Sequence, residues 1–401
     1  MRCRCCSRSR CWWCGSIAAI SIGCCRAPSR GSAARRVADR EGSRSADIAR
    51  LRLIRTPKIG PITYAQLIAR FGDAAAAIEA LPMLAARGGG KPPAIAETRA
   101  VEREMAAVAK LGARYLFLGD AEYPPLLAEL ENAPVALTVR GEASLLRRTT
   151  VAMVGARNAS AAACRFARQL AHGLAGDGVA VVSGLARGID TAAHVGALEG
   201  GTIAVIAGGI DVAYPPENAE LQERIARDGL LIAEMPPGTE PRARHFPYRN
   251  RIIAGLALGT VVVEAAPKSG SLITARLAGE AGREVMAVPG SPLDPRAQGC
   301  NGLIREGATL VQSAEDVFDQ IRPIDARMVR SPAQGFDGAQ PADASDAERR
   351  VIETLLGPVA VAVDELIRQS GLAPAVVQTV LLELELAGRI ERHAGGRVSL
   401  T

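Results

Sequence analysis

The side chains with the clearest binding chemistry lie between residues 242 and 251, which read Arg-Ala-Arg-His-Phe-Pro-Tyr-Arg-Asn-Arg and include no acidic residue. Guanidinium groups bind phosphate oxygens in a forked geometry, and Phe246 or Tyr248 could stack on a nucleic-acid base. The alternative is that both rings belong to the core and that the arginines pair with acids, namely Glu234, Glu240 or Glu264. Four arginines without an intervening acid favour an anion-binding site.

Two loops that follow predicted buried strands have the composition of anion-binding turns. Residues 155–160 (Gly-Ala-Arg-Asn-Ala-Ser) open a predicted helix capped by Ser160, and Arg157 lies where the positive end of that helix favours an anion. Residues 183–190 begin with a serine and a glycine where a nicotinamide-binding fold requires an acidic residue. No GxGxxG opens the first helix either, so the pattern argues against a dehydrogenase.

Two further loops carry small and polar residues at strand ends. Residues 207–211 contain two glycines that let a ligand approach the backbone, and Asn218 is predicted to cap the next helix. A plain strand-to-helix turn is the alternative there. Residues 264–274 enter a helix whose first amides, together with Lys268 and two serines, could hold a phosphate. A simple helix cap is the alternative for this second loop.

The elements that must position these loops alternate regularly. Short apolar runs read as buried strands and are separated by helical segments at 160–175, 190–200, 217–228 and 271–281. This alternation indicates an α/β fold, a parallel sheet with helices on both faces. Right-handed crossovers bring the loops after the strands to one edge, where ligands bind. The strands are predicted at 151–154, 179–182, 203–206, 230–233, 261–263 and 285–288.

At 401 residues, with 48% hydrophobic and 22% charged residues, the chain is expected to be globular and to form two or three domains. The sheet domain is placed at 112–322. Residues 45–111 are predicted to be helical, and the turn at 56–61 suggests a helix-hairpin-helix (SAM-like) element that either holds a DNA backbone or only packs. Residues 323–345 read as a linker, and 346–401 show the three helices and terminal hairpin of a winged helix.

The predicted recognition helix of the winged helix, about 373–387, contains Glu383 and Glu385 and no basic residue. A helix in the major groove lies among phosphates, so two carboxylates disfavour duplex DNA, and only Gln378 could read a base edge. We therefore expect this module to act through protein contacts or as a regulatory cover.

The first 44 residues differ in composition from the rest of the chain. They carry a net charge of +8, which leaves −2 on the other 357 residues. The overall charge of +6 therefore does not indicate that residues 45–401 bind nucleic acid. They also hold seven of the nine cysteines. The favoured interpretation is an extension that is unstructured or results from a start codon assigned too far upstream; a signal peptide and a zinc site are the alternatives. The two remaining cysteines suit a reducing cytoplasm, and no apolar run reaches the roughly 20 residues of a membrane span.

Several long strings, in order, resemble the DNA-processing protein A (DprA/Smf) family. They are Ser183-Gly-Leu-Ala-Arg-Gly-Ile-Asp190, Tyr214-Pro-Pro-Glu-Asn218, Phe246-Pro-Tyr-Arg-Asn-Arg-Ile-Ile-Ala-Gly255, Val262-Val-Glu-Ala-Ala-Pro-Lys-Ser-Gly-Ser-Leu-Ile-Thr274, Val288-Pro-Gly290 and Gly299-Cys-Asn-Gly-Leu-Ile304. The likeness covers roughly 47–322 strongly and the C-terminal module more loosely. Glu217 departs from members that carry a basic residue in the second string.

The resemblance implies an extended Rossmann-like domain that binds single-stranded DNA, forms a homodimer and helps load RecA recombinase onto incoming DNA during natural transformation. It implies no catalytic activity, no cofactor and no metal, and the scattered histidines agree with this. The residues predicted to contact DNA or phosphate are Gly155, Arg157, Ser183, Gly184, Arg187, Gly188, Asn218, Arg242, Arg244, Phe246, Arg249, Asn250, Arg251, Lys268, Ser269, Gly270 and Ser271.

A second class of function uses similar loops. Rossmann-like enzymes that hydrolyse nucleoside monophosphates combine glycine-rich strand ends with an acid near a phosphate-binding helix, and Glu264 and Arg251 could take such roles. Those enzymes are usually compact single domains, whereas this chain carries two flanking modules.

Overall fold

A nine-stranded sheet, seen in the computed structural model, forms the centre of the chain; the structure describes residues 30–327, 343–393 and 395–401. The strand order is β1-β2-β6-β5-β4-β3-β7-β8-β9, with β6 to β9 all parallel and β1 and β2 added antiparallel at one edge. The strands are β1 (Arg114–Phe117), β2 (Ala136–Gly141), β3 (Thr150–Gly155), β4 (Ala180–Ser183), β5 (Thr202–Ile206), β6 (Leu230–Ala233), β7 (Gly259–Val263), β8 (Glu284–Ala287) and β9 (Thr309–Leu310).

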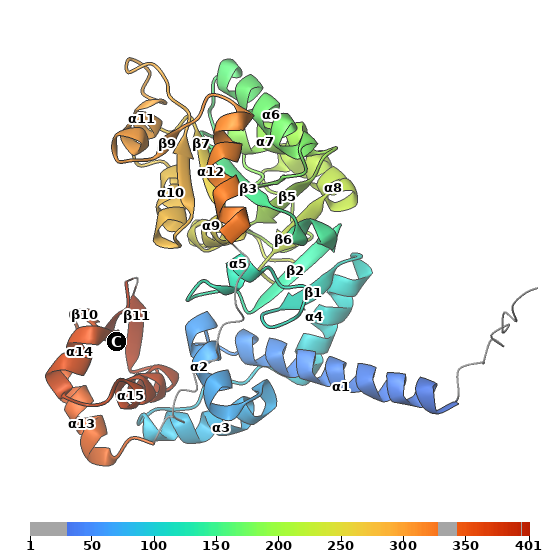
Figure 1. Ribbon diagram of the computed structural model, residues 1–401. Helices are drawn as coiled ribbons and strands as arrows, with labels where there is room; N and C mark the ends of the chain where they lie inside the picture. The colour runs from blue at the N-terminus through green and yellow to red at the C-terminus, as the bar shows by residue number, and fades with distance from the viewer. Residues whose placement is uncertain (1–29, 328–342, 394) are drawn as a thin grey trace, which may run out of the picture. The chain divides into compact units, whose positions relative to one another are not determined.

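Helices cover both faces of this sheet, as the apolar runs predict. Along β3, Val151 and Met153 pack into one core with α6, α7 and α12, whereas Ala152 and Val154 pack into the other with α9 and α11. Figure 1 shows α6 and α7 lying together beside the strands. The helices are α5 (Pro125–Ala128), α6 (Ala161–Gly176), α7 (Ile189–Ala197), α8 (Ala219–Asp228), α9 (His245–Leu256), α10 (Gly270–Glu280), α11 (Gln298–Arg305) and α12 (Ala314–Arg327), with short 3-10 turns at Ala143–Arg147 and Pro216–Asn218.

The N-terminal helical domain contains α1 (Arg30–Arg55), α2 (Pro61–Phe71), α3 (Ala74–Arg87) and α4 (Thr98–Lys110). Helix α1 begins within the stretch expected to be an unstructured extension, and residues 1–29 of that stretch lie outside the described residues. Residues Met1–Ser45 and Ala46–Thr401 form two separate compact units. In the second unit, α1 ends at the turn 56–61, and α2 starts with Pro61 at its first position, where the missing N–H costs nothing.

The C-terminal winged-helix domain follows Ser345, which caps α13 in a capping box with Glu348. Its core is formed by the apolar face of the third helix, α15, with α13, α14 and the hairpin. Most of the predicted linker lies outside the described residues, although 323–327 still belong to α12. The elements are α13 (Asp346–Leu355), β10 (Val361–Ala362), α14 (Val363–Ser370), α15 (Pro374–Ala387), β11 (Ile390–His393) and β12 (Arg397–Leu400).

Within the described ranges, no single helix has the length and apolar composition needed to cross a membrane. The bent pair α14 and α15 passes on length and composition only, and most residues of α15 are buried.

Candidate nucleic-acid interface

The strand order reverses beside β3. From β3 the chain adds β4, β5 and β6 on one side and then returns to place β7 on the other side. Loops that leave neighbouring parallel strands in opposite directions open a crevice at the carboxyl ends, which is where α/β sheets bind ligands. The structure thus brings the predicted strand-end loops to one place.

Two adjoining cavities occupy this edge. One, of about 360 Å³, lies between the loops after β3, β4 and β5 and the start of α9. The other, of about 620 Å³, lies between the loops after β3 and β7. Of the predicted residues, the first is lined by Arg157, Gly184, Arg187, Phe246 and Arg249, and the second by Gly155, Arg157, Phe246, Arg249, Asn250, Ser269, Gly270 and Ser271.

Phe246 lies on the boundary between the two cavities and is flanked by two guanidinium groups. The central carbon of Arg157 is 5.1 Å from the ring centroid, and that of Arg249 is 5.9 Å away. The ring of Tyr214 lies 5.9 Å from the same centroid at an interplanar angle of 57°. An aromatic face between two cations offers a stacking surface beside positive charge, the combination that single-stranded nucleic acids require.

Arg249 lies within the electrostatic influence of a buried carboxylate. Asp190 accepts hydrogen bonds from the amides of Gly184 and Ala186 at 3.2 and 3.3 Å, and its charge attracts Arg249. Burial lowers the pKa of Arg249 to about 10, against the opposing pull of Asp190, so the guanidinium remains charged near neutral pH. The guanidinium packs directly on Gly184, where a Cβ would lie 1.7 Å from Nη1 of Arg249 and would displace it.

The N-terminus of α6, where an anion was expected beside Arg157, is already occupied by the protein itself. Ser160 caps the helix as predicted, accepting from the amide of Ala163. The Glu264 carboxylate, from the loop after β7, then accepts from the Ser160 amide at 2.8 Å and from its hydroxyl at 2.6 Å. In Rossmann folds that bind nucleotides, the positive N-terminus of this helix binds a phosphate. Here the Glu264 carboxylate occupies that position.

Several other predicted residues build the loops rather than line the cavities. The Ser183 hydroxyl donates to the Met153 carbonyl, and the Asn218 amide donates to the carbonyl of Leu185 at 2.9 Å instead of capping α8. Gly188 has φ +76°, and a Cβ there would lie 2.3 Å from the carbonyl oxygen of Ala156. Their contribution to binding is the shape of the loops.

The predicted basic residues differ in how free their charges are. Arg187 is exposed and pairs with Glu217 at 2.7 Å, so the unusual acid of that loop cancels a neighbouring cation. Arg251 is buried outside both cavities, where it binds Glu234 and the carbonyl of Asn132. This is the ion pairing that the alternative interpretation foresaw, and we leave Arg251 out of the proposed surface. Arg242, Arg244 and Lys268 are exposed and line neither cavity.

Several residues that line these cavities were not predicted from the sequence, among them Asn158, Tyr214 and Arg296. Asn158 lies in the loop 155–160 and Tyr214 begins the string 214–218, so both segments were predicted. The sequence alone did not reveal that these two side chains are exposed to the cavities. Arg296 comes from the loop before α11 and pairs with Asp294 at 2.8 Å, a position that no local signal marks.

The geometry does not favour the nucleoside-hydrolase alternative. Glu264 is committed to the α6 terminus and Arg251 to Glu234, so neither is free for the role that such an enzyme would give it. Burial lowers the pKa of His194 to about 3 and raises that of Cys300 to about 11, which keeps both neutral and unreactive near pH 7. Among the residues that the structure describes, no group of three His, Cys, Asp or Glu could hold a metal ion.

Comparison with family models matches three consecutive parts of the chain. The model described as DNA recombination-mediator protein A covers residues 114–322. A DprA-like N-terminal HHH domain covers 44–107, and a DprA winged helix domain covers 337–396.

Curated relatives and a solved structure agree with these models. DNA processing protein DprA of Streptococcus pneumoniae is 49% identical over 201 residues, which is 50% of this chain and 71% of the relative. Protein Smf of Escherichia coli is 39% identical over 290 residues, 71% of this chain and 77% of the relative. The X-ray structure of the Streptococcus pneumoniae protein superposes with a TM-score of 0.53 at 44% identity, covering 56% of this chain and 78% of that one.

Proposed function

We propose that this chain, which belongs to the DprA (Smf) family of DNA-processing proteins, binds single-stranded DNA across the two strand-end cavities. The observation that carries the proposal is Phe246 between the Arg157 and Arg249 guanidinium groups at the switch point of the sheet. Bases stack on the ring whatever their identity, and phosphates meet the two cations, so binding shows weak sequence preference and strong salt dependence.

The biological role that we propose is to protect incoming single-stranded DNA and to help load RecA recombinase onto it during natural transformation. The protein acts in the cytoplasm and forms a homodimer. Two strand-end surfaces in one dimer hold one DNA strand more tightly than a single surface does. The match to recombination-mediator and DNA-processing proteins supports this role. A monomer in solution at micromolar concentration would count against the dimer.

We further propose that the protein binds DNA without catalysing a reaction on it. The commitment of Glu264 and Arg251 to internal partners supports this view. Incubation with nucleoside monophosphates is expected to release no free base, and measurable release would revive the hydrolase alternative.

The binding proposal is tested by fluorescence anisotropy with labelled single-stranded oligonucleotides of unrelated sequence at about 0.15 M salt. The full-length protein is expected to bind them with similar affinities, and the Arg157→Ala/Phe246→Ala variant is expected to lose most of that affinity. If the double variant bound as tightly as the native protein, the strand-end cavities would not be the binding site.

A further inference from the structure

The recognition helix of the winged helix, α15, is packed against the helical domain. Leu382 and Leu386 of α15 share a core with Leu53, Ile59 and Tyr64. The fit is close where α3 ends. A Cβ at Gly88 would lie 2.1 Å from the Glu383 carbonyl oxygen, and one at Gly90 would lie 2.4 Å from that of Ala387.

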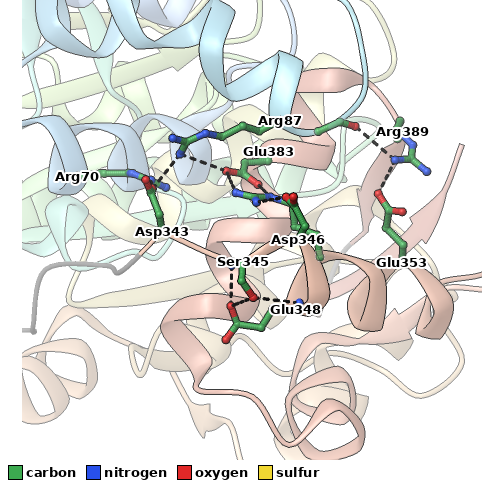
Figure 2. Close-up of polar contacts among 11 residues, drawn as sticks. Arg70, Arg87, Asp343, Ser345, Asp346, Glu348, Glu353, Glu383 and Arg389 are labelled. Carbon is green, nitrogen blue, oxygen red and sulfur yellow. Dashed lines mark hydrogen bonds and ion pairs between the residues drawn. The ribbon is translucent and has the colours of Figure 1, made fainter.

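Charges of opposite sign meet across this contact, as Figure 2 shows. The helical domain contributes Arg70 and Arg87, which both bind the Asp343 carboxylate, the latter at 2.9 Å. Arg87 also lies 3.9 Å from the Glu383 carboxylate, which is fully buried and held by Arg349 at 2.8 and 3.1 Å.

A third cation, Lys58, lies in the turn between α1 and α2. Its Nζ lies directly beside Gly388, because a Cβ on that glycine would be only 2.2 Å from Nζ. Gly388 is the C-cap of α15, and the negative end of a helix dipole favours a cation. The turn 56–61 is the one whose sequence suggested contact with a DNA backbone. In this structure it faces the end of a helix of the same chain.

The acids of α15 therefore have a role that the sequence did not suggest. Glu383 and Glu385 do not project toward a DNA groove, because Glu383 is buried against Arg349 and Glu385 pairs with Arg392 at 2.9 Å. Gln378, the predicted reader of a base edge, accepts a hydrogen bond from Gln66 at 3.1 Å. The docked helix is kept from duplex DNA by its packing on the helical domain.

We propose that Lys58, Arg70 and Arg87 form a second site for the phosphate backbone of DNA, and that the winged-helix domain, together with Asp343 just before it, covers this site with anionic groups. Two carboxylates and a helix C-terminus occupy the positions where phosphate oxygens bind. In addition, Nη1 of Arg70 is buried without a hydrogen-bond partner among the described residues, so this guanidinium retains donor capacity. Because one face cannot hold both occupants, DNA on it and docking of α15 exclude each other.

The test opens the contact by steric wedges in the full-length chain. Gly88→Ala/Gly90→Ala places two methyl groups against the α15 backbone, and neither glycine has a φ that strains alanine. Gly60→Ala in the same domain is the matched control, because its Cβ meets nothing within 4 Å. Point substitutions are preferable to truncation, since removing α15 would uncover the core that Leu382 and Leu386 share with the helical domain.

The measurement is the salt dependence of binding to a single-stranded oligonucleotide, with a duplex of equal length in parallel. Each phosphate contact adds about 0.7 to the slope of log affinity against log salt for single strands, so three freed cations add up to about 2. The added slope is expected in the wedge variant and absent in the control. It is expected to fall to at most about 0.7, the share of Arg70, when Lys58→Ala and Arg87→Ala are combined with the wedges. A gain confined to the duplex would identify duplex DNA as the ligand of this face.

The same comparison is repeated with Phe246→Ala added to both the wedge variant and the Gly60→Ala control. Binding at the strand-end cavities is then weakened equally in both proteins and does not obscure the result. Asp343→Ala, which removes an exposed carboxylate, is the second variant in case the wedges impair folding, and it is expected to raise the slope in the same direction. The native slope in a folded wedge variant and in Asp343→Ala would overturn the proposal, whatever the outcome for the strand-end cavities.

Discussion

Arg157 offers the sharpest quantitative test of the strand-end surface. It is exposed, lines both cavities and has its guanidinium stacked over Phe246. A charged hydrogen bond to phosphate contributes about 1.5–3 kcal/mol, and exposure places Arg157 at the lower end of that range. Arg157→Ala is therefore expected to weaken binding to all single-stranded sequences about tenfold and to reduce the salt slope by about 0.7.

The control for Arg157 is a pair that leaves the net charge unchanged. Arg187 and Glu217 lie in the same region, are paired at 2.7 Å and are both about 60% exposed. Arg187→Ala/Glu217→Ala is expected to keep the native salt slope, because it removes one charge of each sign. Titrations by fluorescence anisotropy over a series of salt concentrations measure both slopes. An Arg157→Ala slope equal to the native one would refute the assignment of this cation to a phosphate.

Three further outcomes follow from the contacts at this edge of the sheet. Phe246→Ala is expected to cost about 1–3 kcal/mol of binding free energy, and Phe246→Tyr is expected to retain most of it; equal affinities for all three proteins would exclude stacking. Glu264→Gln is expected to destabilise the central domain in urea by about 1–2 kcal/mol, because the Ser160 amide and hydroxyl lose a charged acceptor, and unchanged stability would contradict this anchor. Burial lowers the pKa of His194 from 6.5 to about 3, so the neutral ring is favoured in the folded protein. Its contribution to stability is complete above about pH 6.5 and is lost toward pH 3, at up to about 1.4 kcal/mol per pH unit. Urea unfolding at several pH values measures that loss, which His194→Gln should diminish.

The parallel strands were predictable because each is an uninterrupted apolar run between helices. All six predicted strands are present within a residue or two of their expected limits. Three strands of this sheet were missed: β1 is half exposed at an antiparallel edge, β9 is only two residues long, and β2 is buried but has Thr138 and Arg140 within its apolar run. Edge strands with one exposed face do not read as continuous apolar segments.

The arginine-rich stretch shows why a local pattern can name the right region and still misplace a side chain. Residues 245–256 form α9, and positions two apart on a helix face in different directions. Arg249 consequently points into the cavities, whereas Arg251 points to Glu234.

Contacts between distant parts of the chain were beyond sequence reasoning. The Glu264 carboxylate meets Ser160 across 104 positions, and no local signal announces that pairing. Glu383 was predicted to repel DNA from an exposed helix, but it is buried because α3, some 300 residues earlier in the chain, covers that helix.

The most direct test of the central claim is a hydrogen-exchange footprint of the full-length protein with and without a saturating single-stranded oligonucleotide. We expect slowed amide exchange at 155–160, 183–188, 243–250 and 266–271, the segments that surround Phe246 at the strand ends. Protection confined to other parts of the chain, with these four segments unchanged at saturation, would contradict it.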